Sequence, residues 1–207
     1  MKKTKTYFMA LIGMLITTMT FTACLNNDNQ IPQLTTEEIQ AMLKQTQGVY
    51  TGYSKAAASI TATDSVDNVS WTVAEDITIH NFPLSNIALF LEQNTGTQYT
   101  DLVNALKTAV PAELKLHHGY LDNKAPYIYL LIAADPLETT VNVNGKQETV
   151  KVTFMPYSDY RYTSATYDIT NRAIGILLTV QSIQVNGITI GNSMQPYQIL
   201  LMSKNKS

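Results

Sequence analysis

The pattern of apolar and polar positions predicts a helical start followed by a body rich in β-strands. Thr35 and Glu38 form a capping box, because each side chain can bond a backbone amide that the first helical turn leaves free. A helix should begin there and end before Gly48. Two further segments, 83–94 and 100–109, have apolar residues at helical spacing. Two or three helices are therefore expected.

Long stretches of the chain alternate between apolar and polar residues, as strands with one buried face do. Residues 69–80 follow this pattern and predict one strand, with Glu75 marking a kink. Residues 127–133 are apolar at almost every position. They predict a central strand covered on both faces, one of them by the helix pair. Residues 197–202 predict the last strand.

Two Asn-Gly pairs predict tight turns between strands. Asn144-Gly145 and Asn186-Gly187 each lie between alternating segments, and Asn-Gly favours the two-residue type I′ hairpin. In the first hairpin the valines and the phenylalanine within 141–154 fall on one face. One side of this hairpin should therefore be core and the other solvated.

The apolar positions of the strand before the second hairpin change from even to odd numbers after residue 180. A β-bulge near Gln181 and Ser182 would account for this change. Because bulges bend strands, we predict an α+β fold with a mainly antiparallel sheet, curved or barrel-like, over a single domain of residues 35–207. A closed barrel and an open sheet both remain alternatives.

The N-terminal segment has the composition of an export signal. Lys2, Lys3 and Lys5 precede an uncharged and mostly apolar run over residues 7–16. A helix that crosses the hydrocarbon core needs about 20 apolar residues, and this run is shorter. It is followed by a small residue and then by Cys24, the only cysteine of the chain.

Residues 21–24, Phe-Thr-Ala-Cys, resemble the lipobox of bacterial lipoproteins, with Phe21 where leucine is usual. The resemblance implies that residues 1–23 are a signal peptide removed in front of Cys24, and that the thiol then carries lipid. Residues 24–34 would be the lipidated cysteine and a polar tether that reaches about 30 Å. The alternative is a plain secreted protein in which Cys24 is incidental.

The predicted location is the outer membrane. Leu25 directly after the cysteine resembles lipoproteins that are passed on to that membrane. In such proteins an acidic cluster near the cysteine favours display on the outer surface, and here Asp28 stands alone. Periplasmic and surface-facing orientations therefore both stay open. The membrane, bound through the lipid anchor, is the first expected partner.

The beginning of the sheet resembles the calycin-like, or lipocalin-like, barrels. In these a helix is followed by Gly-x-aromatic at the first strand, as Gly48 and Tyr50 are here, with tyrosine in place of the usual tryptophan. The resemblance implies a barrel architecture and no ligand. As a whole the chain resembles small lipoproteins of unknown function from Gram-negative anaerobes, some of which have such bodies.

Charge and motifs do not point to a catalytic, metal or cofactor site. Without the leader, 11 basic residues stand against 16 acidic ones, a formal net charge of −5, which argues against nucleic acid as a partner. His117 and His118 are neighbours on a predicted strand and point to opposite faces, so they cannot bind one metal ion together. The chain has no H-E-x-x-H, no Gly-x-Ser-x-Gly and no phosphate loop. We expect no cofactor and no metal.

Tyrosine is the one unusual feature of the composition, with 12 residues against a single tryptophan. A phenol ring offers a flat apolar face and a hydroxyl, a combination that binds sugars and peptides. A cluster in the second half of the chain is the predicted binding surface: Tyr157, Tyr160, Arg161, Tyr162 and Tyr167. The alternative is that these tyrosines simply suit strands and cover sheet edges.

The sequence therefore favours a non-catalytic binding or accessory module of the cell envelope. Its partner would be a carbohydrate, a peptide or an envelope protein. One alternative is a hydrolase built from His117 or His118 and carboxylates at strand ends, which would require a pocket that holds a histidine beside an acid. The other alternative is a structural subunit of a fimbria-like assembly, which would present an unpaired and apolar edge strand.

Overall fold

The structure is a computed structural model, and it describes residues 34–57, 63–156 and 163–206, with the side chains of 191–196 and 205–206 excepted. The predicted leader, Cys24 and most of the predicted tether lie outside the described residues. From Leu34 onward the chain clusters as one compact unit. No helix in the described part of the chain is long and apolar enough to cross a membrane.

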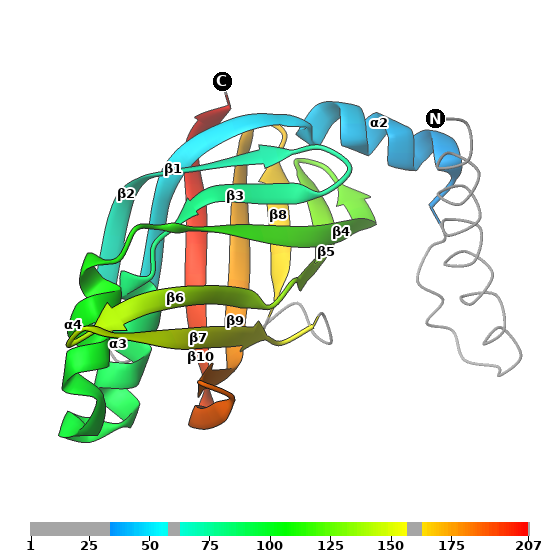
Figure 1. Cartoon of the computed structure of the whole chain (residues 1–207). Coiled ribbons are helices and arrows are strands. Elements are labelled where there is room, and N and C mark those ends of the chain that lie inside the picture. The colour runs from blue at the N-terminus through cyan, green and yellow to red at the C-terminus, as the bar shows by residue number, and fades with distance from the viewer. Residues whose placement is uncertain (1–33, 58–62, 157–162, 207) are drawn as a thin grey trace, which may run out of the picture. The chain divides into compact units, whose positions relative to one another are not determined.

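The described residues form three α-helices, one 3-10 helix and ten strands (Figure 1). In chain order they are α2 (Thr36–Thr46), β1 (Gly48–Ala57), β2 (Thr63–Val73), β3 (Ile77–Phe82), α3 (Ser85–Asn94), η2 (Gly96–Tyr99), α4 (Thr100–Thr108), β4 (Ala112–Lys124), β5 (Tyr127–Ala134), β6 (Leu137–Val143), β7 (Lys146–Phe154), β8 (Ser164–Asp168), β9 (Ala173–Val185) and β10 (Ile188–Lys206). The three predicted helices are present at the expected places. The fold is mostly β, with helices in the minority.

Eight of the strands form a closed antiparallel barrel. They neighbour one another in the order β10, β1, β2, β3, β4, β5, β8 and β9, and β9 pairs with β10 again, which closes the ring. β7 pairs with the part of β9 that lies beyond β8, and β6 pairs with β7. The hairpin of β6 and β7 therefore extends the barrel wall at one end (Figure 1). The prediction of a mainly antiparallel, barrel-like sheet is confirmed.

Closure of the barrel requires a glycine where β1 meets β10. The register of β1 shifts beside Gly52 on both of its edges, so the strand bends there. A Cβ atom at this position would lie 1.9 Å from the carbonyl oxygen of Met202 in β10. No other residue fits, because two backbones approach each other where any side chain would begin.

The predicted bulge in β9 is confirmed. Thr153 of β7 pairs with Ser182, whereas the next residue, Phe154, pairs with Val180, so Gln181 is the additional residue. The buried apolar residues of β9 have even numbers up to Val180 and then continue at Ile183. Because of the bulge, apolar side chains face the barrel interior both before and after the bend in β9.

Both predicted hairpin turns are also confirmed. Asn144 and Gly145 have φ angles of +53° and +84°, and Asn186 and Gly187 have angles of +49° and +79°. These left-handed conformations at both central positions are those of a type I′ turn. Val143 therefore faces Lys146 across the first turn, as the alternating pattern requires.

The single strand predicted over residues 69–80 is wrong. It is a hairpin of β2 and β3, in which Val73 pairs with Ile77 and the amide of Ala74 donates to the carbonyl of Asp76. Three residues, 74–76, connect the two strands. Because this number is odd, the inward-facing residues next to the turn have odd numbers in both strands. The alternation therefore runs through the turn without a break, and the sequence reads as one strand.

The prediction that β5 is covered on both faces is also wrong. Its even-numbered residues 128–132 are buried, but Tyr127 and Tyr129 on the outer face are 39% and 36% exposed. The helix pair packs elsewhere, because α3 contacts β1, β2 and β10, and α4 contacts β6. Six consecutive residues of α3, 86–91, are buried, so this helix forms part of the core.

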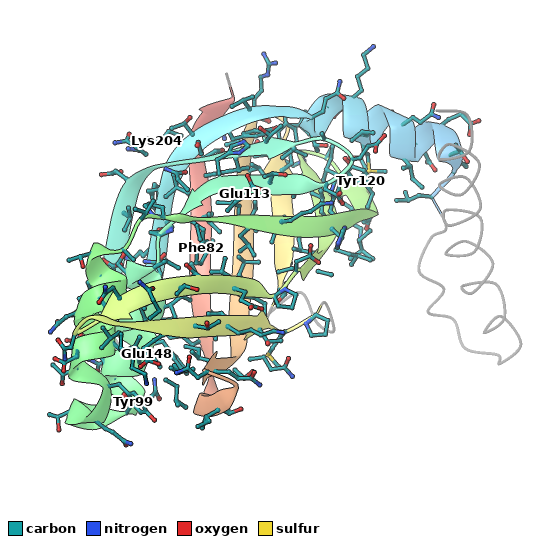
Figure 2. All side chains as sticks on the ribbon, in the orientation of Figure 1. Phe82, Tyr99, Glu113, Tyr120, Glu148 and Lys204 are labelled. Carbon is teal, nitrogen blue, oxygen red and sulfur yellow. The ribbon has the colours of Figure 1, made fainter. Side chains whose placement is uncertain are left out.

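Large side chains fill the described part of the barrel interior. Trp71 and Tyr50 stack with ring centroids 6.2 Å apart. Phe82, which is labelled in Figure 2, meets Phe154 edge to face at the same separation. All four rings are at most 4% exposed. The inward faces of the strands thus form one packed hydrophobic core.

The close contact at Gly52 leads to a prediction about stability. Gly52→Ala should lower the free energy of unfolding by about 3 kcal/mol, because the backbone of β10 cannot move aside without opening the barrel. Gly175→Ala is the matched control, since its Cβ would meet the Sδ atom of Met202 at 2.8 Å. That atom belongs to a flexible side chain, so the loss should stay below about 1 kcal/mol. Urea unfolding measures both, and equal losses would contradict this account.

Candidate functional site

A groove of about 400 Å³ runs over the outer wall of the barrel where β5, β8, β9 and β10 lie side by side. It is present because four outward positions of β8 and β9 carry small residues. The small residues at its floor are Ser164, Thr166, Ala173 and Gly175. The inward positions of the same two strands are mostly large, so the hollow is confined to the outer face.

Larger side chains on the neighbouring strands form the sides of this groove. Strand pairing places Tyr129 of β5 beside Thr166, Thr166 beside Gly175, and Gly175 beside Met202 of β10. A line across the wall therefore runs from an aromatic ring over two small residues to a methionine. Met202, Tyr127 and Leu200 line the groove, and Tyr129 lies next to it through its pairing with Thr166.

The tyrosines of β5 form a pair on this surface. The ring centroids of Tyr127 and Tyr129 are 6.3 Å apart, with the planes inclined by 56°. Both rings are more than one-third exposed, although they are large aromatic groups. An exposed aromatic pair beside a groove with an apolar floor and polar residues at its rim can stack a sugar ring or an apolar side chain.

A second cluster of tyrosines lies at the end of the barrel beside α2. The hydroxyl of Tyr50 donates to the carbonyl of Thr46, and the hydroxyl of Tyr120, which is labelled in Figure 2, lies 2.6 Å from that of Thr46. Thr46 also donates to the carbonyl of Met42. The carbonyl of Thr46, which the end of the helix leaves without an intrahelical partner, thus finds one in β1, and the two tyrosines tie α2 to the barrel.

The hydroxyls at this end influence one another. Burial raises the pKa of Tyr50, the nearby Tyr167 and Tyr120 raise it further, and the charge of Arg172 acts in the opposite direction. Burial also raises the pKa of Tyr120, against the effect of its hydrogen bond to Thr46. Tyr50 and Tyr120 therefore stay neutral hydrogen-bonding groups.

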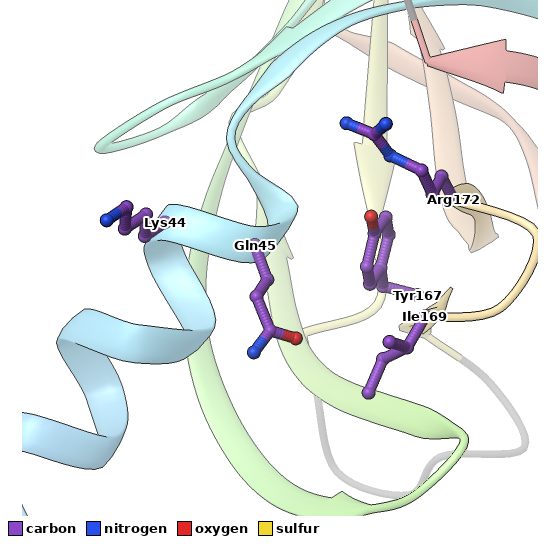
Figure 3. A pocket seen from close by; sticks show the side chains of 5 residues that line it. All are labelled: Lys44, Gln45, Tyr167, Ile169 and Arg172. Carbon is purple, nitrogen blue, oxygen red and sulfur yellow. The ribbon is translucent and has the colours of Figure 1, made fainter.

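A pocket of about 280 Å³ opens beside this cluster (Figure 3). Lys44 and Gln45 line it from the last turn of α2, and Tyr167, Ile169 and Arg172 line it from the end of β8 and the turn that follows. In Figure 3 the Tyr167 hydroxyl points towards the Arg172 guanidinium. The lining thus combines two cationic side chains with polar and apolar neighbours.

The predicted tyrosine surface lies mostly outside the described residues, namely Tyr157, Tyr160, Arg161 and Tyr162. Tyr167, its remaining member, is described. Its side chain is 3% exposed on the inner face of β8, and it lines the pocket beside α2.

Sequence reasoning did not find the groove. The period of a strand places Tyr127 and Tyr129 on one face, but the small residues at 164–166, 173 and 175 were not recognised as the floor of a groove. That run of small residues was the available signal. It becomes a groove only when the barrel places those small residues beside the two tyrosines.

The histidines do not meet the requirement of the hydrolase hypothesis. His117 lies on the outer wall, 54% exposed, with Nδ1 at 2.8 Å from Asp76 and Nε2 at 3.2 Å from Asp135. Both ring nitrogens face carboxylates, so neither is presented to a substrate. His118 lies on the opposite face, as predicted, against the ring of Tyr120.

His80 is bonded to the hydroxyl of Thr72 on the exposed side of the β2–β3 hairpin. Among the described residues, no group of three or more His, Cys, Asp or Glu side chains could hold a metal ion. Neither the outer-wall groove nor the pocket beside α2 contains a histidine in its lining.

The carboxylate cluster leads to a prediction about pH. Partial burial would raise the pKa of Asp76, but hydrogen bonds and charges from Lys115 and His117 outweigh it and hold this pKa below its ordinary value. Ionised Asp76 therefore stabilises the fold above about pH 4, and this contribution is lost as the pH falls through the folded-state pKa. Asp76→Asn should lower the free energy of unfolding by at most about 1 kcal/mol at neutral pH. On acidification the free energy of unfolding of this variant should also fall less than that of the natural protein. Urea unfolding at several pH values measures both, and an equal fall would contradict this prediction.

Comparison with models of known protein families found a match. A family model described as a domain of unknown function, DUF4840, matches residues 45–185, which run from the last turn of α2 to the end of β9. The comparisons with curated proteins and with solved structures found no match. Because the model covers well over half of the chain, the protein belongs to the DUF4840 family.

Proposed function

We propose that this protein is a membrane-anchored, non-catalytic binding module of the cell envelope, whose outer-wall groove binds a linear carbohydrate or peptide. The observation that carries the proposal is the groove floored by Gly175 and its small neighbours and lined by Tyr127, whose ring pairs with that of Tyr129. A folded protein does not need a hollow and two exposed aromatic rings at the same place on its wall.

The shape and chemistry of the groove favour an extended ligand. It follows the direction of β8 and β9, because its floor residues are alternate positions of these two strands. Its rim carries Asp168 and Asn171 near one end, and Leu177 and Leu200 lie near the other. A chain of sugar rings or a short peptide would place apolar faces on the floor and polar groups at the rim.

The N-terminal sequence supports the membrane anchor. The basic head, the apolar run and the lone Cys24 are what a lipoprotein leader requires, and two or three acyl chains would hold the protein on the outer membrane. The proposal covers both periplasmic and surface-facing orientations. The closed barrel after a helix is compatible with a calycin-like body, with its ligand on the wall because the interior is packed.

The two other hypotheses receive less support. The histidine geometry does not favour a hydrolase. A structural subunit would present an edge strand to another chain. The edge strand here is β6, the last strand in the order of the sheet. The side chains that β6 exposes are Glu138, Thr140 and Asn142, which are polar, and α4 contacts this strand. An apolar edge ready for another chain is therefore not what β6 presents.

Binding by the groove can be tested with paired variants. Arrays of oligosaccharides and of peptides would first be probed with the full chain. For each ligand retained, Tyr127→Ala should weaken binding about three- to tenfold, through the loss of one aromatic stacking contact. Gly175→Val should weaken binding at least as much, because its side chain fills the floor of the groove.

Ile188→Ala provides the control, since Ile188 is an exposed apolar residue, 69% accessible, that does not line the groove. It should leave binding unchanged. Calorimetry measures the three affinities, and urea unfolding checks that each variant folds. If both Tyr127→Ala and Gly175→Val bound a ligand as tightly as the natural protein does, the groove would be excluded as its binding site.

The anchor can be tested separately. In a bacterium that processes lipoproteins, the natural protein should partition into detergent and carry acyl mass on its N-terminal peptide. Cys24→Ser should remove the acyl mass, prevent cleavage of the leader at that position and abolish lipid-dependent partitioning. Normal leader removal and unchanged partitioning in Cys24→Ser would show that the protein is not a lipoprotein.

A further inference from the structure

We propose that the pocket at the α2 end of the barrel binds a small organic anion, held chiefly by Arg172 with Lys44 as the second cation. The proposal concerns a different surface from the groove and does not depend on it. The two residues come from segments far apart in the sequence, yet they line one pocket of about 280 Å³. Figure 3 shows Arg172 beside Tyr167 on one side and the last turn of α2 on the other.

Arg172 occupies an unusual backbone position. Its φ angle is +53°, and the other non-glycine residues with positive φ in the described chain are all asparagines, which tolerate this conformation. An arginine gains nothing from such a place in a turn. It does, however, direct a long cationic side chain to the end of the barrel beside Tyr167.

The turn that carries Arg172 is held firmly. The carboxylate of Asp168 accepts hydrogen bonds from the amide of Thr170 at 2.8 Å, and from the amide and side chain of Asn171 at 3.0 and 2.7 Å. The amide of Ile169 donates to the carbonyl of Pro126 in the neighbouring turn. A fixed turn holds the backbone of Arg172 in place, so that only its side chain has to be ordered when a ligand binds.

Neither cation of this pocket is neutralised within the described chain. The lysines that form ion pairs with carboxylates there are Lys107, Lys115, Lys124, Lys146 and Lys204. Among the described side chains, no carboxylate lies within ion-pair distance of Arg172 or Lys44. The nearest acid along the chain, Asp168, is occupied by the hydrogen bonds of its own turn.

The end of α2 does not oppose an anion strongly. Free carbonyls in the last turn of a helix would repel negative charge. Here the carbonyl of Leu43 accepts from the amide of Gln47, and that of Thr46 accepts from the hydroxyl of Tyr50. These two carbonyls are therefore occupied, which reduces the repulsion that the end of the helix would exert on an anion.

The ligand class follows from this lining. A guanidinium binds carboxylate and phosphate oxygens in the same forked geometry. Ile169 adds one apolar contact, and the volume suits a molecule of a few heavy atoms beyond its anionic group. The expected ligand is therefore a small organic acid or a small phosphate ester, which share an oxyanion.

The two arginines of the chain, Arg161 and Arg172, make a direct test possible. The full chain with Cys24→Ser, labelled with nitrogen-15, should give two arginine Nε signals in NMR spectra. Titration with inorganic phosphate and, separately, with succinate should shift the Arg172 signal to saturation, and sodium chloride at equal ionic strength should not. Arg161→Gln identifies the Arg172 signal.

The variants have graded expectations. Arg172→Gln should weaken binding of the probe about tenfold or more, as expected for loss of a charge-assisted pair. Lys44→Gln should weaken it about two- to fivefold, because its amine is a single exposed charge. Lys55→Gln on β1 changes the net charge equally and should have no effect. Urea unfolding of each variant verifies that it folds.

Saturation by phosphate alone, by succinate alone or by both would support the site and identify the anion that it prefers. Three results would overturn the proposal. They are no saturable shift with either probe, the same shift with chloride, and unchanged affinity in both Arg172→Gln and Lys44→Gln.

Discussion

The structure depends on one contact between backbones, that of β1 with β10 at Gly52. β10 pairs with β9 on one edge and with β1 on the other, so it is the strand that turns a bent sheet into a ring. Once the ring is closed, every alternate residue of every strand is assigned either to a packed interior or to the outer wall. The groove and the tyrosine pair are consequences of that assignment.

The packed interior explains where binding surfaces can lie in this protein. Trp71, Tyr50, Phe82 and Phe154 occupy space that a ligand would use in a hollow barrel. What the barrel leaves available is its wall and its ends. The wall is hollowed where small residues of β8 and β9 adjoin, and one end is shaped by α2 and the turn after β8. Both surfaces meet at β8, whose outward residues floor the groove and whose inward Tyr167 lines the pocket.

The helix α2 links the barrel to the segment that precedes it in sequence. Its capping box and the hydrogen bonds of Thr46 with Tyr50 and Tyr120 fix both of its ends. It therefore has a defined position on the barrel although little of its surface is apolar core. If Cys24 is the lipid anchor that we propose, this helix is the first rigid element after the tether.

The sequence by itself determined the features that depend on neighbours along the chain. These are the capping box at Thr35, the turns at Asn144 and Asn186, and the bulge at Gln181, because each follows from local backbone geometry. Only the tertiary structure decided that residues 69–80 form a hairpin, that α3 is buried core and that Tyr127 is exposed. Those outcomes depend on which strands become neighbours when the barrel closes, and periodicity along one strand carries no information about its neighbours. For the same reason the sequence contained the small residues of the groove and the cations of the pocket, but not the fact that they meet.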